Sequence, residues 1–207
     1  RHYPPGLGPS GASINALLED AEGHVWVGVW GGGINRVLEG ASGRLTFVPY
    51  RHDPANPTSL GVDDVNVLLQ DRSGVIWVGT YGVGLSSFKP DGRIQLTQYR
   101  HSPADSRTIG DDRVHALLVD RAGTTWIGTW AGLNLLRPGA AAFERLPAAG
   151  FLSDERVTSL AEGLDGSIWV GTLDGGVNRV NPQTMRVEQV RARAELQGGG
   201  GISSDRV

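Results

Sequence analysis

The hydrophobic positions of the chain recur in one short segment that appears four times. Within each copy, apolar residues alternate with a tryptophan and a glycine, as in the Val-Trp-Val-Gly-Val run at 25–29. Successive side chains of a strand point to opposite faces, so both faces here are apolar or small. A half-exposed strand would alternate apolar with polar residues, and the pattern therefore predicts a strand covered on both sides. The copies are residues 23–29, 74–80, 123–129 and 166–172, with Trp26, Trp77, Trp126 and Trp169 at their centres and Gly28, Gly79, Gly128 and Gly171 two positions later.

Each copy is predicted to be the second of four short strands in a repeated unit. Turns such as 20–23 and 71–74 separate the strands, with glycine where the backbone needs a positive φ. The predicted strands are residues 13–19, 24–30, 34–38 and 44–50; 64–70, 75–81, 85–89 and 93–99; 113–119, 124–130, 133–136 and 142–146; and 156–161, 167–173, 177–180 and 185–190.

Four-stranded units repeated every 43 to 51 residues are typical of β-propeller blades. We therefore predict an all-β chain of four consecutive four-stranded antiparallel blades. A sandwich or a barrel is the alternative, but neither requires near-identical units. The predicted blades are residues 1–50, 51–99, 100–146 and 147–190, followed by a linker and the start of a fifth blade at 191–207.

The last residues repeat the beginning of a unit. Residues 203–207 match 110–114 and 153–157, which predicts a fragment of a larger, seven-bladed propeller. The outer faces of blades 1 and 4 are then expected to be uncovered, with the Trp26 strand at one end and the Trp169 strand at the other. The predicted partners of these faces are the remaining blades of the protein or, for the fragment, a second copy in a homodimer.

Composition narrows the possible functions. With 39% hydrophobic and 20% charged residues, the 207-residue chain can build a core. The formal net charge of −3 argues against a nucleic-acid partner, which requires a strongly basic face. No apolar run approaches the length of a membrane span, so we expect no direct membrane insertion of this segment. Cysteine is absent and no common catalytic motif occurs, so we expect no metal, no cofactor and no catalytic residues.

The repeats resemble the two-component regulator propeller repeat. The shared pattern is Val-x-x-Leu-x-x-Asp-x-x-Gly-x-x-Trp-Val/Ile-Gly-Thr-x-x-Gly-x-Gly-Leu, and residues 65–85 fit it best. The inter-blade loop at 51–60 is similar to that of the family. Three departures occur: Val29 replaces threonine, the third unit is one residue short after Trp130, and Gly163 replaces the turn aspartate.

The resemblance implies a bacterial membrane-bound sensor. Members of the family place propellers in the periplasm, as the sensor part of an inner-membrane protein with a histidine kinase or diguanylate cyclase output. Their ligands are often oligosaccharides. The resemblance thus implies a ligand-sensing, non-enzymatic segment whose partner is a small-molecule ligand such as an oligosaccharide. Two alternatives stay open: a propeller enzyme resembling streptogramin lyase, and a protein-interaction scaffold.

Three aromatic residues form the first candidate site. Trp30, Tyr81 and Trp130 each lie four residues after a repeat tryptophan, at the turn between the second and third strands. Aromatic faces at this position could stack on sugar rings or on a cation. The alternative is that they pack beneath the neighbouring inter-blade loop.

Polar residues at the start of the first strand form the second candidate site. They could rim a channel that binds a charged or hydroxylated ligand. The candidates are Asp63, Asp64 and Asn66 in the second blade, Asp112, Arg113 and His115 in the third, and Glu155, Arg156 and Thr158 in the fourth. The alternative is a solvated ring of ion pairs between blades. His115 is the one histidine placed for an enzymatic role in this region.

Two further patterns are interpreted as structural. His2, His52 and His101 occur once per blade, too far apart to share a metal ion, and are predicted to hold their loops. The aspartates of the Asp-x-x-Gly turns lack the alternating oxygen ligands of a calcium loop and are predicted to form hairpin turns.

Overall fold

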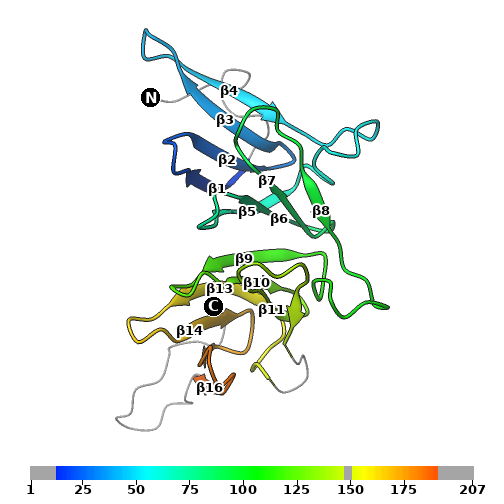
Figure 1. The fold of residues 1–207 in the computed structure, drawn as a ribbon, viewed down its shortest axis with the longest axis vertical. Coiled ribbons are helices and arrows are strands. Elements are labelled where there is room, and N and C mark those ends of the chain that lie inside the picture. Colours follow the sequence, from blue (N-terminus) through cyan, green and yellow to red (C-terminus); the bar gives the residue numbers. More distant parts are fainter. Residues whose placement is uncertain (1–12, 147–150, 191–207) are drawn as a thin grey trace. The chain divides into compact units, whose positions relative to one another are not determined.

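The computed structural model describes residues 13–146 and 151–190, and every regular element in these residues is a β-strand (Figure 1). The strands form four antiparallel sheets of four strands each, and neighbours in each sheet follow one another in the chain. The chain divides into two compact units, residues 1–100 and 101–207, each with two sheets. The predicted four consecutive four-stranded antiparallel blades are confirmed.

The first unit contains blades 1 and 2. The strands of blade 1 are β1 (Ser13–Glu19), β2 (Val25–Trp30), β3 (Gly33–Glu39) and β4 (Leu45–Tyr50). Those of blade 2 are β5 (Val65–Gln70), β6 (Ile76–Thr80), β7 (Leu85–Phe88) and β8 (Thr97–Tyr99). Residues 1–12 and the predicted role of His2 lie outside the described residues.

The second unit contains blades 3 and 4. The strands of blade 3 are β9 (Val114–Val119), β10 (Thr125–Thr129), β11 (Gly132–Leu136) and β12 (Glu144–Arg145). Those of blade 4 are β13 (Val157–Glu162), β14 (Ile168–Thr172), β15 (Val177–Val180) and β16 (Val187–Val190). The predicted start of a fifth blade at 203–207 lies outside the described residues.

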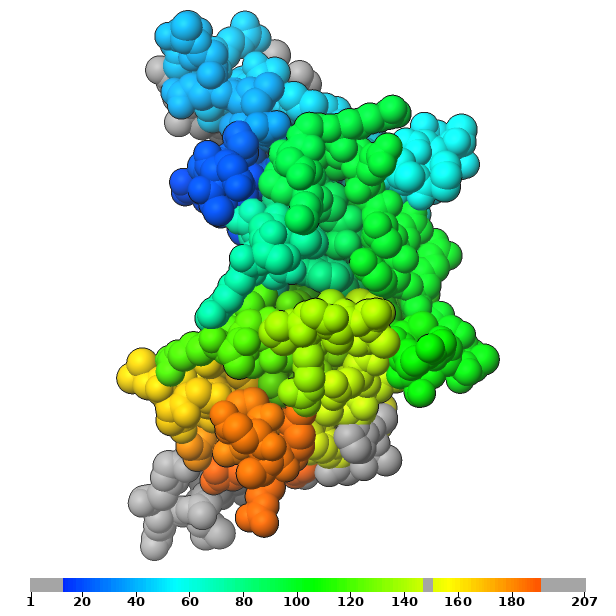
Figure 2. All heavy atoms as spheres, in the orientation of Figure 1, coloured from blue at the N-terminus to red at the C-terminus, as the bar shows by residue number. Residues whose placement is uncertain are grey.

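The fourth strand is shorter than predicted in blades 2, 3 and 4. The N–H groups of Leu96 and Phe143 donate to the carbonyls of Thr58 and Arg107, at 2.8 and 3.0 Å, in the loops that lead into the same blades. These residues are therefore bound to the inter-blade loops, which project from their units in Figure 2 (cyan, 51–60; green, 100–110). In blade 4, Met185 has a φ of 55°, which interrupts the extended backbone before β16.

An aspartate joins each of the first three hairpins to its tryptophan, and it is buried in blades 1 and 3. In blade 1, Asp20 Oδ1 accepts hydrogen bonds from the N–H groups of Glu22 and His24, and Oδ2 accepts one from Trp26 Nε1 at 2.8 Å. The glycine of the turn, Gly23, has a φ of 80°. The spacing Asp-x-x-Gly-x-x-Trp is thus one device, which we call the Asp–Trp clamp. The sequence had predicted only its turn.

Blades 2 and 3 contain the same clamp. Asp71 and Asp120 each accept a hydrogen bond from the tryptophan six residues later, at 2.8 Å, and from the backbone N–H four residues later. The distance from the indole nitrogen to the carboxylate is 2.8 Å in all three blades, so the clamp is a property of the repeat.

Blade 4 lacks the clamp because Gly163 replaces the aspartate. A Cβ built on Gly163 would lie 2.9 Å from Trp169 Nε1, so the indole occupies the space that the missing side chain leaves. Trp169 is 36% exposed, and the Arg179 guanidinium lies 5.8 Å from its ring centroid. Arg179 also pairs with Asp165 and Glu188, so an ion-pair cluster replaces the clamp at this hairpin.

The glycine after each tryptophan lets two sheets approach closely. A Cβ on Gly28 would lie 2.7 Å from Val65 Cγ1 of blade 2, and a Cβ on Gly128 would collide with Val157 of blade 4. Trp26 packs beside Phe88 of blade 2, with ring centroids 5.1 Å apart. The predicted nesting of ring and glycine is confirmed for these two pairs of blades.

The Trp26 strand was expected to line an uncovered outer face, but the Trp26 side chain itself faces inward. Trp26 is wholly buried in the core shared by blades 1 and 2, because its face of blade 1 packs on blade 2. The exposed apolar side chains of β1 and β2 on blade 1 lie on the opposite face and include Ile14, Leu17 and Val25. In blade 4 it is Trp169 itself that is exposed, as expected.

Replacing Trp77 by alanine should lower the free energy of unfolding by about 3–5 kcal/mol, as for other buried large aromatics. The ring is 5% exposed, donates to Asp71 and lies 5.6 Å from Tyr99. Urea denaturation measures the loss, and Trp30→Ala, at a 41% exposed ring, is the matched control with a smaller effect. A loss below about 1 kcal/mol for Trp77→Ala would contradict the buried position.

The clamp of blade 1 should make stability depend on acid pH. Burial raises the pKa of Asp20, but hydrogen bonds from Trp26 and His24 outweigh it and hold the pKa below its usual 3.8. The folded state therefore favours the carboxylate. The stabilisation is complete above the unfolded pKa and is lost as pH falls through the lower folded value.

Urea denaturation between about pH 5 and pH 2.5 tests this dependence. Asp20→Asn removes the titrating group, so the free energy of unfolding of the variant should fall less steeply as the pH decreases. An unchanged pH dependence in the variant would show that other carboxylates cause the loss of stability in acid.

Candidate functional site

Trp30 and Tyr81 form an aromatic pair at one end of blades 1 and 2. Trp30 ends β2 and Tyr81 follows β6, and their ring centroids lie 5.4 Å apart at an interplanar angle of 54°. Trp30 is 41% exposed and offers an open ring to solvent. The structure thus brings two of the three predicted aromatic residues together, each from a different blade.

Asp64 fixes the turns that carry the aromatic pair. Its Oδ1 accepts a hydrogen bond from the N–H of Gly31 at 2.9 Å, and its backbone carbonyl accepts one from the N–H of Tyr81 at 3.0 Å. One residue of blade 2 therefore holds the turn of blade 1 and that of its own blade. The turns that carry the rings are thus held through their backbone N–H groups, one bonded to the Asp64 side chain and one to its carbonyl.

Trp130, in the second unit, has a different environment. The Arg113 guanidinium lies 4.5 Å from its ring centroid, and the His115 ring stacks on it at 5.6 Å with an interplanar angle of 10°. Three predicted site residues are thus brought together in blade 3. Because its own blade covers the Trp130 ring with a cation and an imidazole, that ring is a poorer open platform than Trp30.

His115 reaches Trp130 because it is the extra residue of a β-bulge. Gly128 pairs with Ala116 and Thr129 with Val114, so His115 has no partner in the strand register. Bulges redirect a side chain away from the regular alternation. The equivalent bulge residue of blade 1, Asn15, donates to the carbonyl of Val65 on blade 2 at 3.1 Å. Burial and, secondly, the Arg113 guanidinium lower the pKa of His115 from 6.5.

The predicted arginines are engaged within their own blades. Arg113 donates through Nε and Nη2 to Asp111 at 2.8 and 2.6 Å, and Arg156 donates in the same way to Asp154 at 3.0 and 2.6 Å. Arg156 also reaches Asp174 of the same blade at 2.8 Å. The alternative of ion pairs between blades is therefore wrong for these arginines, because each pair joins residues of a single blade. They lower the pKa of Asp111 and Asp154 through hydrogen bonds from the arginines.

Asp112 and the loop histidines hold the inter-blade loops. Asp112 Oδ1 accepts a hydrogen bond from the N–H of His101 at 2.7 Å, and His101 Nδ1 donates to the carbonyl of Ile109 at 2.9 Å. His52 does the same with Leu60 at 2.7 Å. The interpretation of these two histidines as loop-holding residues is confirmed by these bonds.

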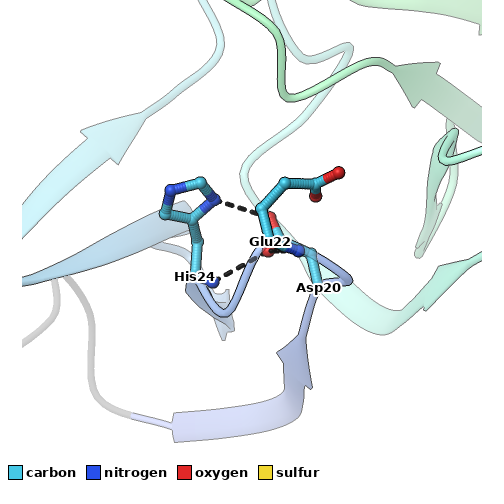
Figure 3. Close-up of side chains that lie close together, drawn as sticks. All are labelled: Asp20, Glu22 and His24. Carbon is cyan, nitrogen blue, oxygen red and sulfur yellow. Dashed lines mark hydrogen bonds and ion pairs between the residues drawn. The ribbon is translucent and has the colours of Figure 1, made fainter.

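Asp20, Glu22 and His24 lie close enough together to suggest a metal site (Figure 3). The dashed lines in the figure join His24 to Asp20, and none reaches the Glu22 carboxylate. Asp20 already accepts four hydrogen bonds from Glu22, His24 and Trp26, and His24 Nδ1 serves as one of the donors. The atoms that would bind a metal are therefore occupied by the turn and the clamp.

The sequence interpretation missed two buried asparagines that position the loops. Asn134 Oδ1 accepts a hydrogen bond from the N–H of Gly110 at 2.8 Å, and Asn178 Oδ1 accepts one from Ser153 at 2.9 Å. Both side chains are nearly inaccessible. The available signal was an asparagine directly after the first apolar residue of the third strand, at Asn35, Asn134 and Asn178.

The repeat threonine was also given no role. The hydroxyls of Thr80, Thr129 and Thr172 donate to the carbonyls of Gly84, Gly132 and Gly176, at 2.8 to 2.9 Å. Each bond spans the turn between the second and third strands. Val29 of blade 1 has no hydroxyl, so this turn lacks that bond.

Comparison with protein families finds the two component regulator propeller at three places, residues 8–31, 59–82 and 108–131. These segments cover the first two strands of blades 1, 2 and 3, which include the Asp–Trp clamp. No match was found among curated proteins.

Several solved structures share the fold. The extracellular domain assigned to a hybrid two component system of B. thetaiotaomicron matches with a TM-score of 0.73 at 19% identity, over 87% of this chain and 25% of that one. A second such domain matches with a TM-score of 0.68 at 19% identity, over 85% and 24%. Virginiamycin B lyase from Staphylococcus aureus matches with a TM-score of 0.56 at 14% identity, over 86% and 55%. The chain thus spans about a quarter of these two extracellular domains.

Replacing Arg113 by glutamine should raise the pKa of His115. The positive charge of Arg113 disfavours the imidazolium, and its removal also frees Asp111 from its ion pair. A pH titration of the imidazole proton resonances by NMR measures the change. An unchanged His115 pKa would contradict the stacked geometry.

Proposed function

This chain is built from two component regulator propeller repeats, and we propose that it is the ligand-sensing propeller segment of an extracytoplasmic sensor protein. Two solved structures of similar fold are extracellular domains of hybrid two component systems, which supports this placement. None of the described residues forms a helix long and apolar enough to cross a bilayer. In the proposal, the output domain is a histidine kinase or a diguanylate cyclase outside this segment, and the compartment is the periplasm.

The observation that carries the ligand-binding role is the Trp30–Tyr81 pair. Exposed aromatic faces suit the C–H faces of sugar rings, and aromatic residues at such positions combine apolar area with a polar edge. Among the described residues, Oδ2 of Asp64 accepts no hydrogen bond, so it is available to a ligand hydroxyl beside the rings. The proposed ligand is therefore an oligosaccharide that stacks on Trp30 and donates to Asp64.

The proposed role is recognition without catalysis. The likeness to virginiamycin B lyase is at 14% identity and concerns the fold. In the lyase-like alternative, His115 would serve as a base, but here it stacks on Trp130 beside Arg113, which disfavours the imidazolium. A binding module needs only the pre-positioned rings and acceptor of blades 1 and 2.

Combined replacement of Trp30 and Tyr81 by alanine should abolish glycan binding and leave the fold intact. A glycan array identifies a binding oligosaccharide, and calorimetry with that oligosaccharide compares the variants. Trp130→Ala is the matched control, since its ring is already covered by Arg113 and His115. Circular dichroism checks the fold.

Unaltered affinity in the double variant would assign Trp30 and Tyr81 to packing. Loss of binding only in Trp130→Ala would move the site to blade 3.

A further inference from the structure

A cleft between blades 3 and 4 opens at the hairpin end of the strands, opposite to the turns that carry Trp130. Its volume is about 450 Å³, within the range of small-ligand sites. Residues of both blades line it, among them Arg121, Trp126, Arg137, Glu162, Gln183 and Met185. We call it the blade 3–4 cleft.

The floor of the cleft is apolar and rigid. Trp126 is almost fully buried and held by its clamp to Asp120 at 2.8 Å. Met185 packs on the core shared by the two blades, and its N–H donates to the carbonyl of Asn181 at 2.8 Å. A ligand would therefore meet Met185 as the accessible apolar side chain of the floor, while Trp126 lies buried in it.

The wall of the cleft is specific to the second unit. The N–H of Arg121 donates to the Glu162 carboxylate at 3.1 Å, and its guanidinium donates to the carbonyls of Gly163 and Leu164. In the first unit, the N–H of Ala21 makes the equivalent bond to Gln70 at 2.7 Å. The repeat supplies the link between blades, and blades 3 and 4 add a guanidinium and a carboxylate that the link between blades 1 and 2 lacks.

The carboxylates around the cleft are already bonded to protein donors. Asp120 accepts from Thr124 and Trp126, and both Glu162 oxygens accept from the N–H of Arg121. Glu144, beside the cleft, accepts from Nε and Nη2 of Arg137.

The unused groups include N–H donors from two side chains, and the Gln183 amide also keeps a free acceptor oxygen. Within residues 13–146 and 151–190, Nη1 of Arg137 and the side-chain amide of Gln183 make no hydrogen bond. A guanidinium edge binds a carboxylate through two parallel N–H bonds, and the Nη1–Nη2 edge of Arg137 still has free hydrogens. The free hydrogen-bonding capacity of the cleft therefore suits an acceptor-rich anion.

We propose that the blade 3–4 cleft binds a small organic carboxylate, up to the size of a disaccharide. Its carboxylate lies on the Nη1–Nη2 edge of Arg137, and its apolar face lies on Met185. This site is separate from the aromatic pair of blades 1 and 2, and it does not depend on the proposed function.

NMR of the tryptophan indole resonances in the full chain tests the proposal. The probe is digalacturonate, with lactose as the neutral sugar and inorganic phosphate as the simple anion. We expect digalacturonate to shift the Trp126 indole resonance, identified by its absence in Trp126→Phe. The Trp26 resonance should not move, because its blade has Leu38 at the position of Arg137.

Arg137→Gln should weaken digalacturonate binding at least tenfold, and Arg93→Gln, at an exposed position of blade 2, should leave it unchanged. The unliganded indole spectrum of each variant confirms folding, since Arg137 is half-exposed. Three results would overturn the proposal: no shift of Trp126, equal affinity in Arg137→Gln, or equal shifts with lactose or phosphate.

Discussion

The hydrogen bond between the turn aspartate and the indole N–H of the repeat tryptophan links hairpin and core in blades 1, 2 and 3. The indole N–H must be buried for the ring to lie between sheets, and leaving it unsatisfied would cost about 1–3 kcal/mol. The carboxylate must be buried to reach it, and its other oxygen is satisfied by the backbone of its own turn. Each group thus offsets the cost of burying the other, and hairpin and core form together.

Blade 4 has lost the clamp, and its tryptophan is held differently. With Gly163 in place of aspartate, Trp169 moves into the vacated space and stays partly exposed. Arg179 then covers the ring and pairs with two carboxylates at the surface. Surface ion pairs contribute little each, about 0–1 kcal/mol. The sheet still forms, because its other face remains packed on blade 3.

The repeat sets the backbone of each blade, and the side chains that differ between blades form the candidate binding sites. Trp30 and Tyr81 form an open aromatic pair, whereas Arg113 and His115 cover Trp130. At the opposite end of the strands, Arg121 replaces the equivalent Ala21 and builds the wall of a cleft. In both places the backbone hydrogen bonds are common to the blades, so a side chain can change without loss of the turn.

Local sequence was sufficient to predict the number, type and order of the strands, because alternation and turn glycines act over a few neighbouring residues. It also indicated the nesting of Gly28 and Gly128 beneath the next sheet. It did not indicate that Trp26 faces inward or that β8 and β12 are short, because these depend on contacts across blades and loops. Nor could it show that Arg113 is paired and stacked whereas Trp30 is open. Packing in three dimensions sets such roles, because the bulge at His115 and the contact of one blade with the next bring together groups that no spacing along the chain relates.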